Sequence, residues 1–341
     1  MKQIASSSIV AAVAAIILLS FAGHLAGAQK PWVVYEGGEG LGQGRHIVFV
    51  TGDEEYRSEE SMPMMARILA AHHGFKCTVL FAINEETGEI DPVVVDNIPG
   101  LAALESADLM VLFVRFRELP DEQMKHIMDY TNSGRPIVAL RTATHPFNYK
   151  KNRDSRYAKW TWNNKAEGME GGYGRQVLGE TWISHYGRHQ KESTLAYIAD
   201  GMERHPITRG VGLIWGPSDV YGLTTLHGDC KPVLMGQVLS GMEPDDAPNR
   251  EKKPLPVAWI KTYKGDEGKA SRVFTTTMGH AGDFHDEDFR RLLVNACFWS
   301  LEMEGRIPTR ADVEIVGEYD PHPIGFGGYK KGLTPADHRM K

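Results

Sequence analysis

The sequence predicts an α/β fold, a flavodoxin-like, doubly wound and mostly parallel sheet with helices on both faces. From Arg45 onward, short apolar runs alternate with segments of helical periodicity, which is the pattern of βαβ units. Several runs are apolar at almost every position, residues 108–114 most clearly, as in parallel strands that are covered on both faces. The 341-residue chain is long enough to bury a large core.

The predicted elements follow one another in the order that such a sheet requires. Ser58 can cap a helix that begins after the first strand, and Gly74 can end it in a left-handed conformation. Pro120 opens a second helix, and Gly134 closes it. Helices are predicted at residues 58–73, 121–133 and 286–301. Strands are predicted at residues 46–51, 76–81, 108–114, 136–140, 192–198, 232–239, 257–260 and 272–277.

The N-terminal segment, residues 1–28, has the pattern of a secretory signal peptide. Lys2 precedes an apolar run at 9–22, and Ala26-Gly27-Ala28 offers the small residues of a cleavage site. A retained membrane anchor is the alternative, because the apolar run is of borderline length. We expect export to the periplasm or the extracellular space, without stable membrane insertion after cleavage. The rest of the chain is expected to form a linker, a folded domain and a Pro/Gly-rich surface extension, at residues 29–44, 45–304 and 305–341.

Charge and cysteine content narrow the classes of partner and cofactor. The chain has 38 Lys+Arg against 44 Asp+Glu, and this mildly acidic balance argues against a nucleic-acid partner. Cys77, Cys230 and Cys297 are widely spaced and form neither a CxxC zinc pair nor a disulfide framework. The sequence is compatible with a homo-oligomer.

Ligands of an open parallel sheet bind beyond the carboxyl ends of the strands, and three loops there carry polar residues. In the first loop, Asp53 or Glu55 could act as a base or a metal ligand, or could only complement the following helix N-terminus. In the last loop, Gly279 and Gly282 flank His280 and let the backbone approach a ligand.

The middle loop, after the strand at 136–140, lies where related α/β enzymes place a nucleophile elbow. It offers Thr142 and Thr144, and threonine is a poor nucleophile without a strongly placed base. Arg141 and His145 are better candidates, for binding an oxyanion and for moving a proton.

A divalent metal is the one cofactor that the sequence suggests. His185 and His189 are four residues apart, a spacing that places two imidazoles on one helix face, and Glu180 lies five residues upstream. Gly187 between them argues against a stable helix, so the metal remains a hypothesis.

Two further stretches are expected near the cleft. Asp219 and Tyr221 follow Gly216-Pro217 in a loop that could face it. Residues 148–175 form a long polar loop with aromatic residues that include Trp160 and Trp162, and such loops often cover functional sites. These aromatic rings could stack on sugar faces, or the loop could be ordinary surface.

Several short motifs, in this order and spacing across residues 45–304, resemble the ThuA-like (trehalose utilisation) family. They are the acidic turn at 51–57, Leu140-Arg141-Thr142-Ala143-Thr144-His145, Leu178-Gly179-Glu180 leading to His185, His205-Pro206-Ile207-Thr208, Ser218-Asp219-Val220-Tyr221, Arg272-Val273-Phe274, Met278-Gly279-His280, and Phe289 to Trp299. The resemblance implies the class I glutamine amidotransferase-like fold. It also implies that glutamine hydrolysis is lost, because working amidotransferases carry a cysteine at the elbow and this chain carries Arg141-Thr142-Ala143-Thr144.

The resemblance further implies a role in carbohydrate catabolism, in a route where a disaccharide is first oxidised to a 3-keto sugar. A 3-keto group acidifies neighbouring C–H bonds, so acid/base residues suffice for elimination, hydration or isomerisation. The predicted acid/base set is His280, His145, Asp53, Glu55 and Arg141. The predicted substrate-binding set is Tyr56, Thr142, Thr144, Glu180, Asp219, Tyr221, Asp283, Trp160 and Trp162. The alternative is a non-catalytic module of the same fold that binds carbohydrate or serves assembly.

Overall fold

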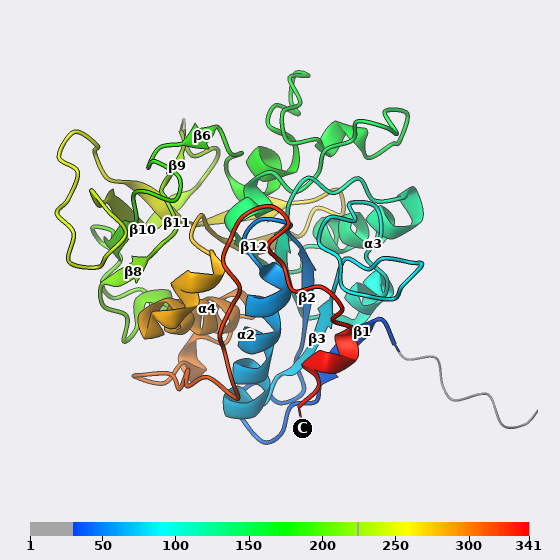
Figure 1. The fold of residues 1–341 in the computed structure, drawn as a ribbon, viewed down its shortest axis with the longest axis horizontal. Coiled ribbons are helices and arrows are strands. Elements are labelled where there is room, and N and C mark those ends of the chain that lie inside the picture. Colours follow the sequence, from blue (N-terminus) through cyan, green and yellow to red (C-terminus); the bar gives the residue numbers. More distant parts are fainter. Residues whose placement is uncertain (1–29, 224, 341) are drawn as a thin grey trace, which may run out of the picture. The chain divides into compact units, whose positions relative to one another are not determined.

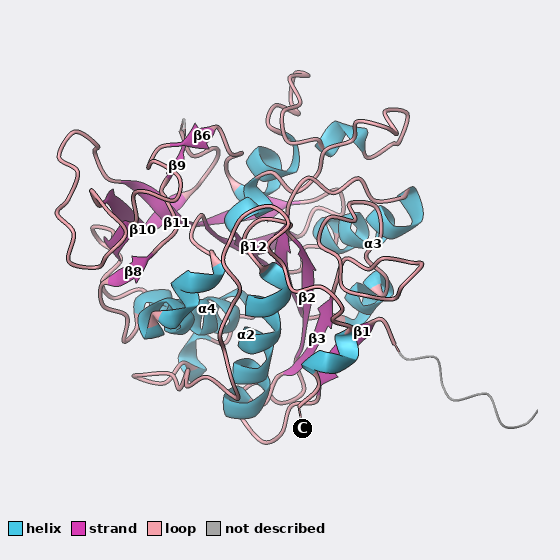
Figure 2. Cartoon of the chain, in the orientation of Figure 1, coloured by secondary structure: helices cyan, strands magenta, loops and turns pink. Residues whose placement is uncertain are grey.

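The computed structural model describes residues 30–223 and 225–340, so the predicted signal peptide lies outside the described residues. Figures 1 and 2 show a central sheet with helices on both sides. The helices are α2 (Ser58–His73), α3 (Asp121–Asn132) and α4 (Glu287–Ser300), with short helical turns η1 (Leu101–Ser106), η2 (Arg141–Thr144), η3 (Ala158–Trp160), η4 (Gly174–Leu178), η5 (Pro206–Thr208), η6 (Ala281–His285), η7 (Glu304–Arg306) and η8 (Pro335–His338). In the described part of the chain, no helix is both long and apolar enough to span a bilayer.

Ten strands form one sheet in the order β1-β3-β2-β4-β5-β12-β11-β10-β7-β8, and β6 pairs with β9 separately. The strands are β1 (Trp32–Tyr35), β2 (His46–Gly52), β3 (Lys76–Leu80), β4 (Leu109–Val114), β5 (Ile137–Leu140), β6 (Ser184–His185), β7 (Thr194–Ile198), β8 (Ile214–Gly216), β9 (Tyr221–Gly222), β10 (Lys231–Val238), β11 (Leu255–Lys264) and β12 (Ala270–Thr276).

The middle of the sheet confirms the predicted flavodoxin-like class. Strands β3, β2, β4, β5 and β12 are parallel neighbours, which is the 2-1-3-4-5 order of doubly wound folds. Beyond β12 the sheet continues with antiparallel strands, and β11 pairs with β12 along seven residues, from Ala258 opposite Thr276 to Lys264 opposite Ala270. The carboxyl ends of β2, β4, β5 and β12 therefore meet at one edge.

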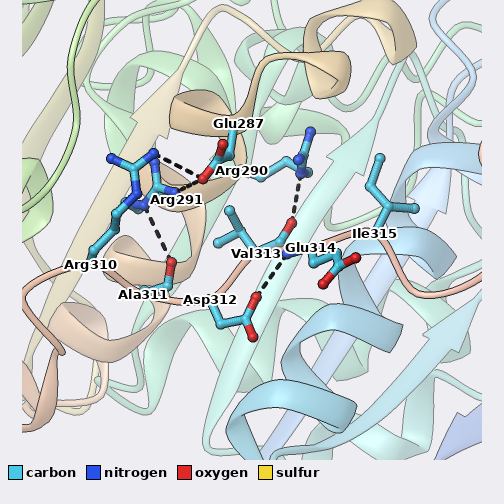
Figure 3. A pocket seen from close by; sticks show the side chains of 9 residues that line it. All are labelled: Glu287, Arg290, Arg291, Arg310, Ala311, Asp312, Val313, Glu314 and Ile315. Carbon is cyan, nitrogen blue, oxygen red and sulfur yellow. Dashed lines mark hydrogen bonds and ion pairs between the residues drawn. The ribbon is translucent and has the colours of Figure 1, made fainter.

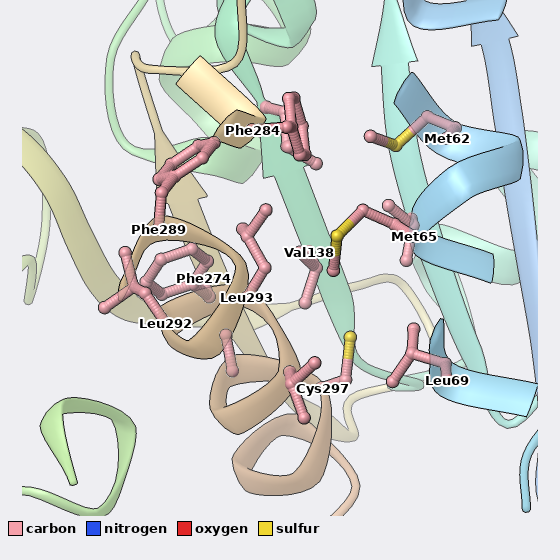
Figure 4. Packing of buried hydrophobic residues seen from close by; sticks show 14 of the residues in the cluster. Met62, Met65, Leu69, Val138, Phe274, Phe284, Phe289, Leu292, Leu293 and Cys297 are labelled. Atoms are coloured by element: carbon pink, nitrogen blue, oxygen red, sulfur yellow. The ribbon is translucent and has the colours of Figure 1, made fainter. Parts of the chain in front are cut away.

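Two apolar clusters cover the two faces of the sheet. On one face, α2 and α4 pack against alternate residues of the central strands, and Figure 4 shows Met65 and Leu69 of α2 near Val138 and near Leu293 and Cys297 of α4. On the other face, α3 and η1 cover the intervening residues, such as Ile137 and Ala139 of β5. Both faces of each central strand are thus buried, as the near-continuous apolar runs predicted.

Two local features differ from the sequence-based expectation. Ser58 does not cap α2, because its Oγ accepts hydrogen bonds from the backbone N–H groups of Gly52 and Asp53 at the end of β2, and Arg57 occupies the cap position with φ 65°. Strand β1 pairs antiparallel with β3, although residues 29–44 were expected to be a linker. A four-residue strand at a sheet edge carries too short an alternation to be recognised in the sequence.

The C-terminal residues 305–340 run over the surface in largely extended form, as the red trace in Figure 1 shows. Ala311 and Val313 are buried in the cluster beneath α4 and α2. Near the end, the hydroxyl of Tyr35 in β1 donates a hydrogen bond of 2.6 Å to the carbonyl of His338. The tail is therefore attached to the domain at both ends of its path.

Candidate functional site

The loops that follow β2, β5 and β12 are joined to one another at the carboxyl edge of the sheet. The Thr142 hydroxyl donates to the Asp53 carboxylate, which links the loops after β5 and β2. Arg141 Nη1 donates to the Thr277 carbonyl at 2.8 Å, which links β5 to β12. The N–H of Ala281 donates to the Tyr56 carbonyl at 3.2 Å, which closes the circle. The polar residues that the sequence placed on three separate loops thus form one site.

Arg141 lies at the centre of this site and is fully buried. It is the first residue after β5 and has φ 46°, so the strained position of the turn holds an arginine. Its guanidinium donates to the Asp219 carboxylate and carbonyl, both at 2.7 Å, and to the Tyr56 hydroxyl at 3.2 Å. The guanidinium carbon also lies 4.5 Å and 3.8 Å from the ring centres of Tyr56 and Tyr221. A buried cation is therefore held rigidly between two rings and a carboxylate.

Asp219 connects this cation to both predicted metal-binding histidines. Its Oδ2 lies 2.7 Å from Nδ1 of His185, and its Oδ1 lies 2.9 Å from Nδ1 of His189. The small β6–β9 ladder, in which His185 stands opposite Tyr221, positions this arrangement. Burial alone would raise the pKa of Asp219, but Arg141 and the two imidazoles hold it well below its usual range.

His189 lies between two carboxylates, because its Nε2 is 3.2 Å from the Glu55 carboxylate. Hydrogen bonds to Asp219 and Glu55 raise its pKa to about 9. At neutral pH His189 is therefore a cation, and Glu55 belongs to the site through this contact.

A divalent metal would have to compete with these protons. One ligand atom from each of His185, His189 and Asp219 lies within 4.8 Å of the others, so the geometry brings together the predicted pair and a third ligand. Both nitrogens of His189 face carboxylates, and a metal bound to either would displace a proton. The residues can hold a cation, and binding would be stronger at alkaline pH.

His145 and His280 are both neutral imidazoles, and they differ in which ring nitrogen carries the proton. The Thr144 hydroxyl donates to the Arg141 carbonyl, so towards His145 Nδ1, at 3.1 Å, it acts as an acceptor. With this assignment His145 carries its proton on Nδ1 and has a lone pair on Nε2. Burial and the charges of Arg115 and Arg141 lower its pKa well below the usual value.

In His280 the tautomer is reversed. Its Nδ1 accepts a hydrogen bond of 2.7 Å from the Gly282 N–H, so its proton is on Nε2. Among residues 30–223 and 225–340, nothing hydrogen-bonds to that Nε2. Burial and then Arg141 lower the pKa of His280 to about 3, so it remains neutral and offers an N–H donor.

Aromatic rings surround the polar cluster on one side. Trp162 lies 5.5 Å from Phe116 and 5.7 Å from Trp182, measured between ring centres. Trp182 in turn lies 5.6 Å from His185, and Phe116 lies 4.8 Å from His145. Partly exposed rings beside polar groups are what a sugar-binding surface requires.

Three predicted residues, Asp53, Thr142 and Thr144, make hydrogen bonds within the protein. Asp53 is buried and accepts from the N–H groups of Glu55 and Tyr56, both at 2.7 Å, in addition to the Thr142 hydroxyl. Burial, with Glu54 nearby, raises its pKa to about 6, and its contacts shape the loop. The Thr142 hydroxyl is the donor to Asp53, and the Thr144 hydroxyl contacts Nδ1 of His145 and so orients that ring.

Three other predicted residues lie within the scaffold. Asp283 is fully buried and accepts from the N–H groups of Gly279 and Ser218, and so holds two site loops together. Glu180 is fully buried, 3.7 Å from Arg175. The ring centre of Trp160 lies 5.9 Å from that of Tyr173 within the second apolar cluster, so this ring stabilises the core. Of the two predicted tryptophans, Trp162 is the one that borders the site.

Sequence reasoning missed Arg115, Phe116 and Trp182. Arg115 and Phe116 directly follow β4, so the rule that selected the other three loops would have found them. Arg115 lies 3.4 Å from the Glu55 carboxylate and also pairs with Glu54. Trp182 stands three residues before His185, in a stretch with no periodicity to place it.

A cavity of about 600 Å³ lies away from these loops, between α4 and residues 310–315 (Figure 3). Its arginines are occupied with the chain itself. Arg290 donates to the Val313 carbonyl at 2.9 Å, Arg291 donates to the Ala311 carbonyl at 3.3 Å, and Arg310 pairs with Glu287. This cavity lies where the tail is attached to α4.

The strand order and the site define a doubly wound, flavodoxin-like α/β protein with an arginine at the elbow turn after β5. A family model described as ThuA, trehalose utilisation, matches residues 46–300, so the chain belongs to the ThuA family.

Solved structures with a similar fold include two putative ThuA-like proteins. The one from Parabacteroides merdae is 15% identical, with a TM-score of 0.45, and the match covers 87% of this chain and 99% of that chain. The one from Bacteroides uniformis is 14% identical, with a TM-score of 0.46, and the match covers 78% of this chain and 95% of that chain. A putative GMP synthase subunit from Thermoplasma acidophilum is 10% identical, with a TM-score of 0.33 and coverage of 75% and 97%. No curated protein matches the sequence.

Proposed function

We propose that this member of the ThuA family is an exported enzyme that acts on a 3-keto-disaccharide or 3-keto-glycoside by acid/base chemistry. Family membership supports a carbohydrate-related role. The observation that carries the proposal is the His185–Asp219 pair, joined at 2.7 Å beside a buried Arg141 and near the unpartnered N–H of His280. These groups supply a base, a positive charge and a hydrogen-bond donor in one place.

His185 is the proposed base. If the Asp219 carboxylate accepts the Nδ1 proton of His185, the Nε2 lone pair is left available, and the side chain is one-third exposed and so within reach of a ligand. His145 is less suited to this role, because its strongly lowered pKa makes it a weak base. Its Nε2 lone pair is instead suited to accept a substrate hydroxyl.

The reaction that suits these groups is β-elimination across the glycosidic bond. His185 takes the proton at C2, next to the C3 carbonyl, and the electron pair flows to the carbonyl oxygen. The His280 N–H and the field of Arg141 stabilise that oxygen. The enolate then expels the glycosidic oxygen from C1, and a C1–C2 double bond forms. The departing oxygen takes a proton from solvent or from protonated His185.

The test is NMR of the purified protein with 3-keto-trehalose and 3-keto-glucosides, for the wild type and the His185→Gln and His280→Gln variants. Each substitution should lower the rate of conversion at least about 100-fold without unfolding the protein. His126→Gln is the matched control, because His126 belongs to α3 and contacts Glu105, which is not part of the site. Wild-type turnover that survives in both site variants would refute the assignment of these roles. Sugar binding without any conversion would favour the non-catalytic carbohydrate-binding module.

A further inference from the structure

The C-terminal tail touches two of the three loops that build the site. The Tyr319 hydroxyl donates at 2.7 Å to the carbonyl of Ala281, the residue after His280. Six residues later, the N–H of Gly325 donates at 2.9 Å to the Glu55 carbonyl. Residues 319–325 therefore run along the edge of the site from the loop after β12 to the loop after β2.

Arg57 fixes this stretch of the tail. Its side chain is fully buried and donates from Nε to the Pro323 carbonyl at 3.1 Å and from Nη2 to the Gly325 carbonyl. A Cβ built on Gly325 would lie 3.8 Å from the side chain of Gln190, so the tail also approaches the turn that carries His189. The backbone on the N-terminal side of Phe326 is thus held by hydrogen bonds to the site loops.

Phe326 follows this hydrogen-bonded stretch, and its ring is exposed to solvent. It is 68% exposed, the highest value among the large apolar side chains of the described chain. Gly325 and Gly327 on either side have φ 117° and 73°, a conformation that favours glycine. The Phe326 ring lies 5.1 Å from the guanidinium carbon of Arg115.

Arg115 connects this ring to the polar cluster. Its guanidinium carbon lies 4.5 Å from the ring centre of Phe116, which is next to His145, and its Nε lies 3.4 Å from the Glu55 carboxylate. Phe326 and Arg115 are therefore contiguous, through Phe116, with the rings of Trp162 and Trp182.

We propose that Phe326 and Arg115 form a second sugar subsite, which takes the neighbouring ring of a disaccharide while the reacting ring lies at His185 and His280. The apolar C–H face of a pyranose would cover the Phe326 ring, and its hydroxyls would meet the Arg115 guanidinium. This inference rests on the proposed function, and it makes the chain selective for two-ring substrates.

The test is calorimetric titration of the full chain with trehalose and with glucose, neither of which carries the reactive keto group. Phe326→Ala should weaken trehalose binding about tenfold and leave glucose binding unchanged, and Phe326→Trp should restore trehalose binding to within about twofold. Leu213→Ala is the matched control, because Leu213 is 64% exposed and belongs to the turn before β8. It should change neither affinity.

The outcomes separate the two proposals. If the wild type binds trehalose and Phe326→Ala binds it equally well, the subsite is refuted and the proposed function stands. An equal loss for trehalose and glucose, or a loss that tryptophan does not restore, also refutes the subsite. If the wild type binds neither sugar, the subsite is refuted, and the proposed function is decided separately by the NMR test with 3-keto sugars.

Discussion

His189 should couple the stability of this protein to pH. Its two ring nitrogens lie 2.9 Å from Asp219 and 3.2 Å from Glu55, and these contacts raise its pKa from 6.5 to about 9. A shift of that size corresponds to about 3 kcal/mol of free energy of unfolding. Because the side chain is 25% exposed, solvent screening reduces the expected contribution to about 2 kcal/mol.

The sign follows from the raised pKa. The folded state favours protonated His189, so the stabilisation is fully present below pH 6.5 and is lost as pH rises through about 9. His189→Gln removes the titrating group, so the stability difference between wild type and variant should shrink by about 2 kcal/mol from pH 6 to pH 10.

The assay is urea unfolding of wild type and His189→Gln at several pH values across that range. His126→Gln is the control, since the carboxylate 3.4 Å from His126 belongs to the exposed Glu105, and this variant should follow the wild-type pH profile. Parallel profiles for wild type and His189→Gln would refute the reasoning, because they would show that His189 does not gain a proton on folding.

Three further predictions concern the same region. Asp219→Asn should destabilise the protein by about 3–5 kcal/mol in urea unfolding, because it leaves Arg141 as a buried cation without its carboxylate, and a change under 1 kcal/mol would contradict this. Apparent Co²⁺ affinity, followed by visible absorption, should rise between pH 6 and pH 9, since the metal displaces imidazole protons, and a pH-independent affinity would contradict metal binding at this cluster. Trp160→Ala should cost about 3 kcal/mol of stability and spare sugar affinity, whereas Trp162→Ala should weaken sugar binding at little cost in stability. If Trp162→Ala instead lost stability and Trp160→Ala lost sugar affinity, the roles assigned to the two tryptophans would be wrong.

The parallel core was predictable because the burial of each strand is visible in that strand's own sequence. A strand such as Leu109–Val114 is buried on both faces, so its sequence is apolar throughout, and Gly74 marks a helix end by its backbone conformation. Strand β1 escaped because four residues at an edge derive their conformation from β3, which follows more than forty residues later.

The sequence predicted where the site residues lie better than it predicted what each of them does. Arg141 and His280 were selected because they follow strand ends, and Asp219 because its loop could face the cleft. These three residues do converge. Nothing in the sequence separates Trp160 from Trp162, which stand two residues apart with one in the core and the other beside the site. Their roles depend on how the loop at 148–175 folds back, which is a tertiary property.

The arginine at the elbow turn determines which kinetic pattern turnover can show. Enzymes with a nucleophile at such a turn work in two half-reactions, and the first product leaves while part of the substrate stays covalently attached. Arg141 is a protonated guanidinium bonded to Asp219, Tyr56 and Thr277, so it cannot form such a bond. Turnover at this turn would therefore show no burst of first product and no ping-pong pattern, and an electrophile aimed at an elbow cysteine would have no target there.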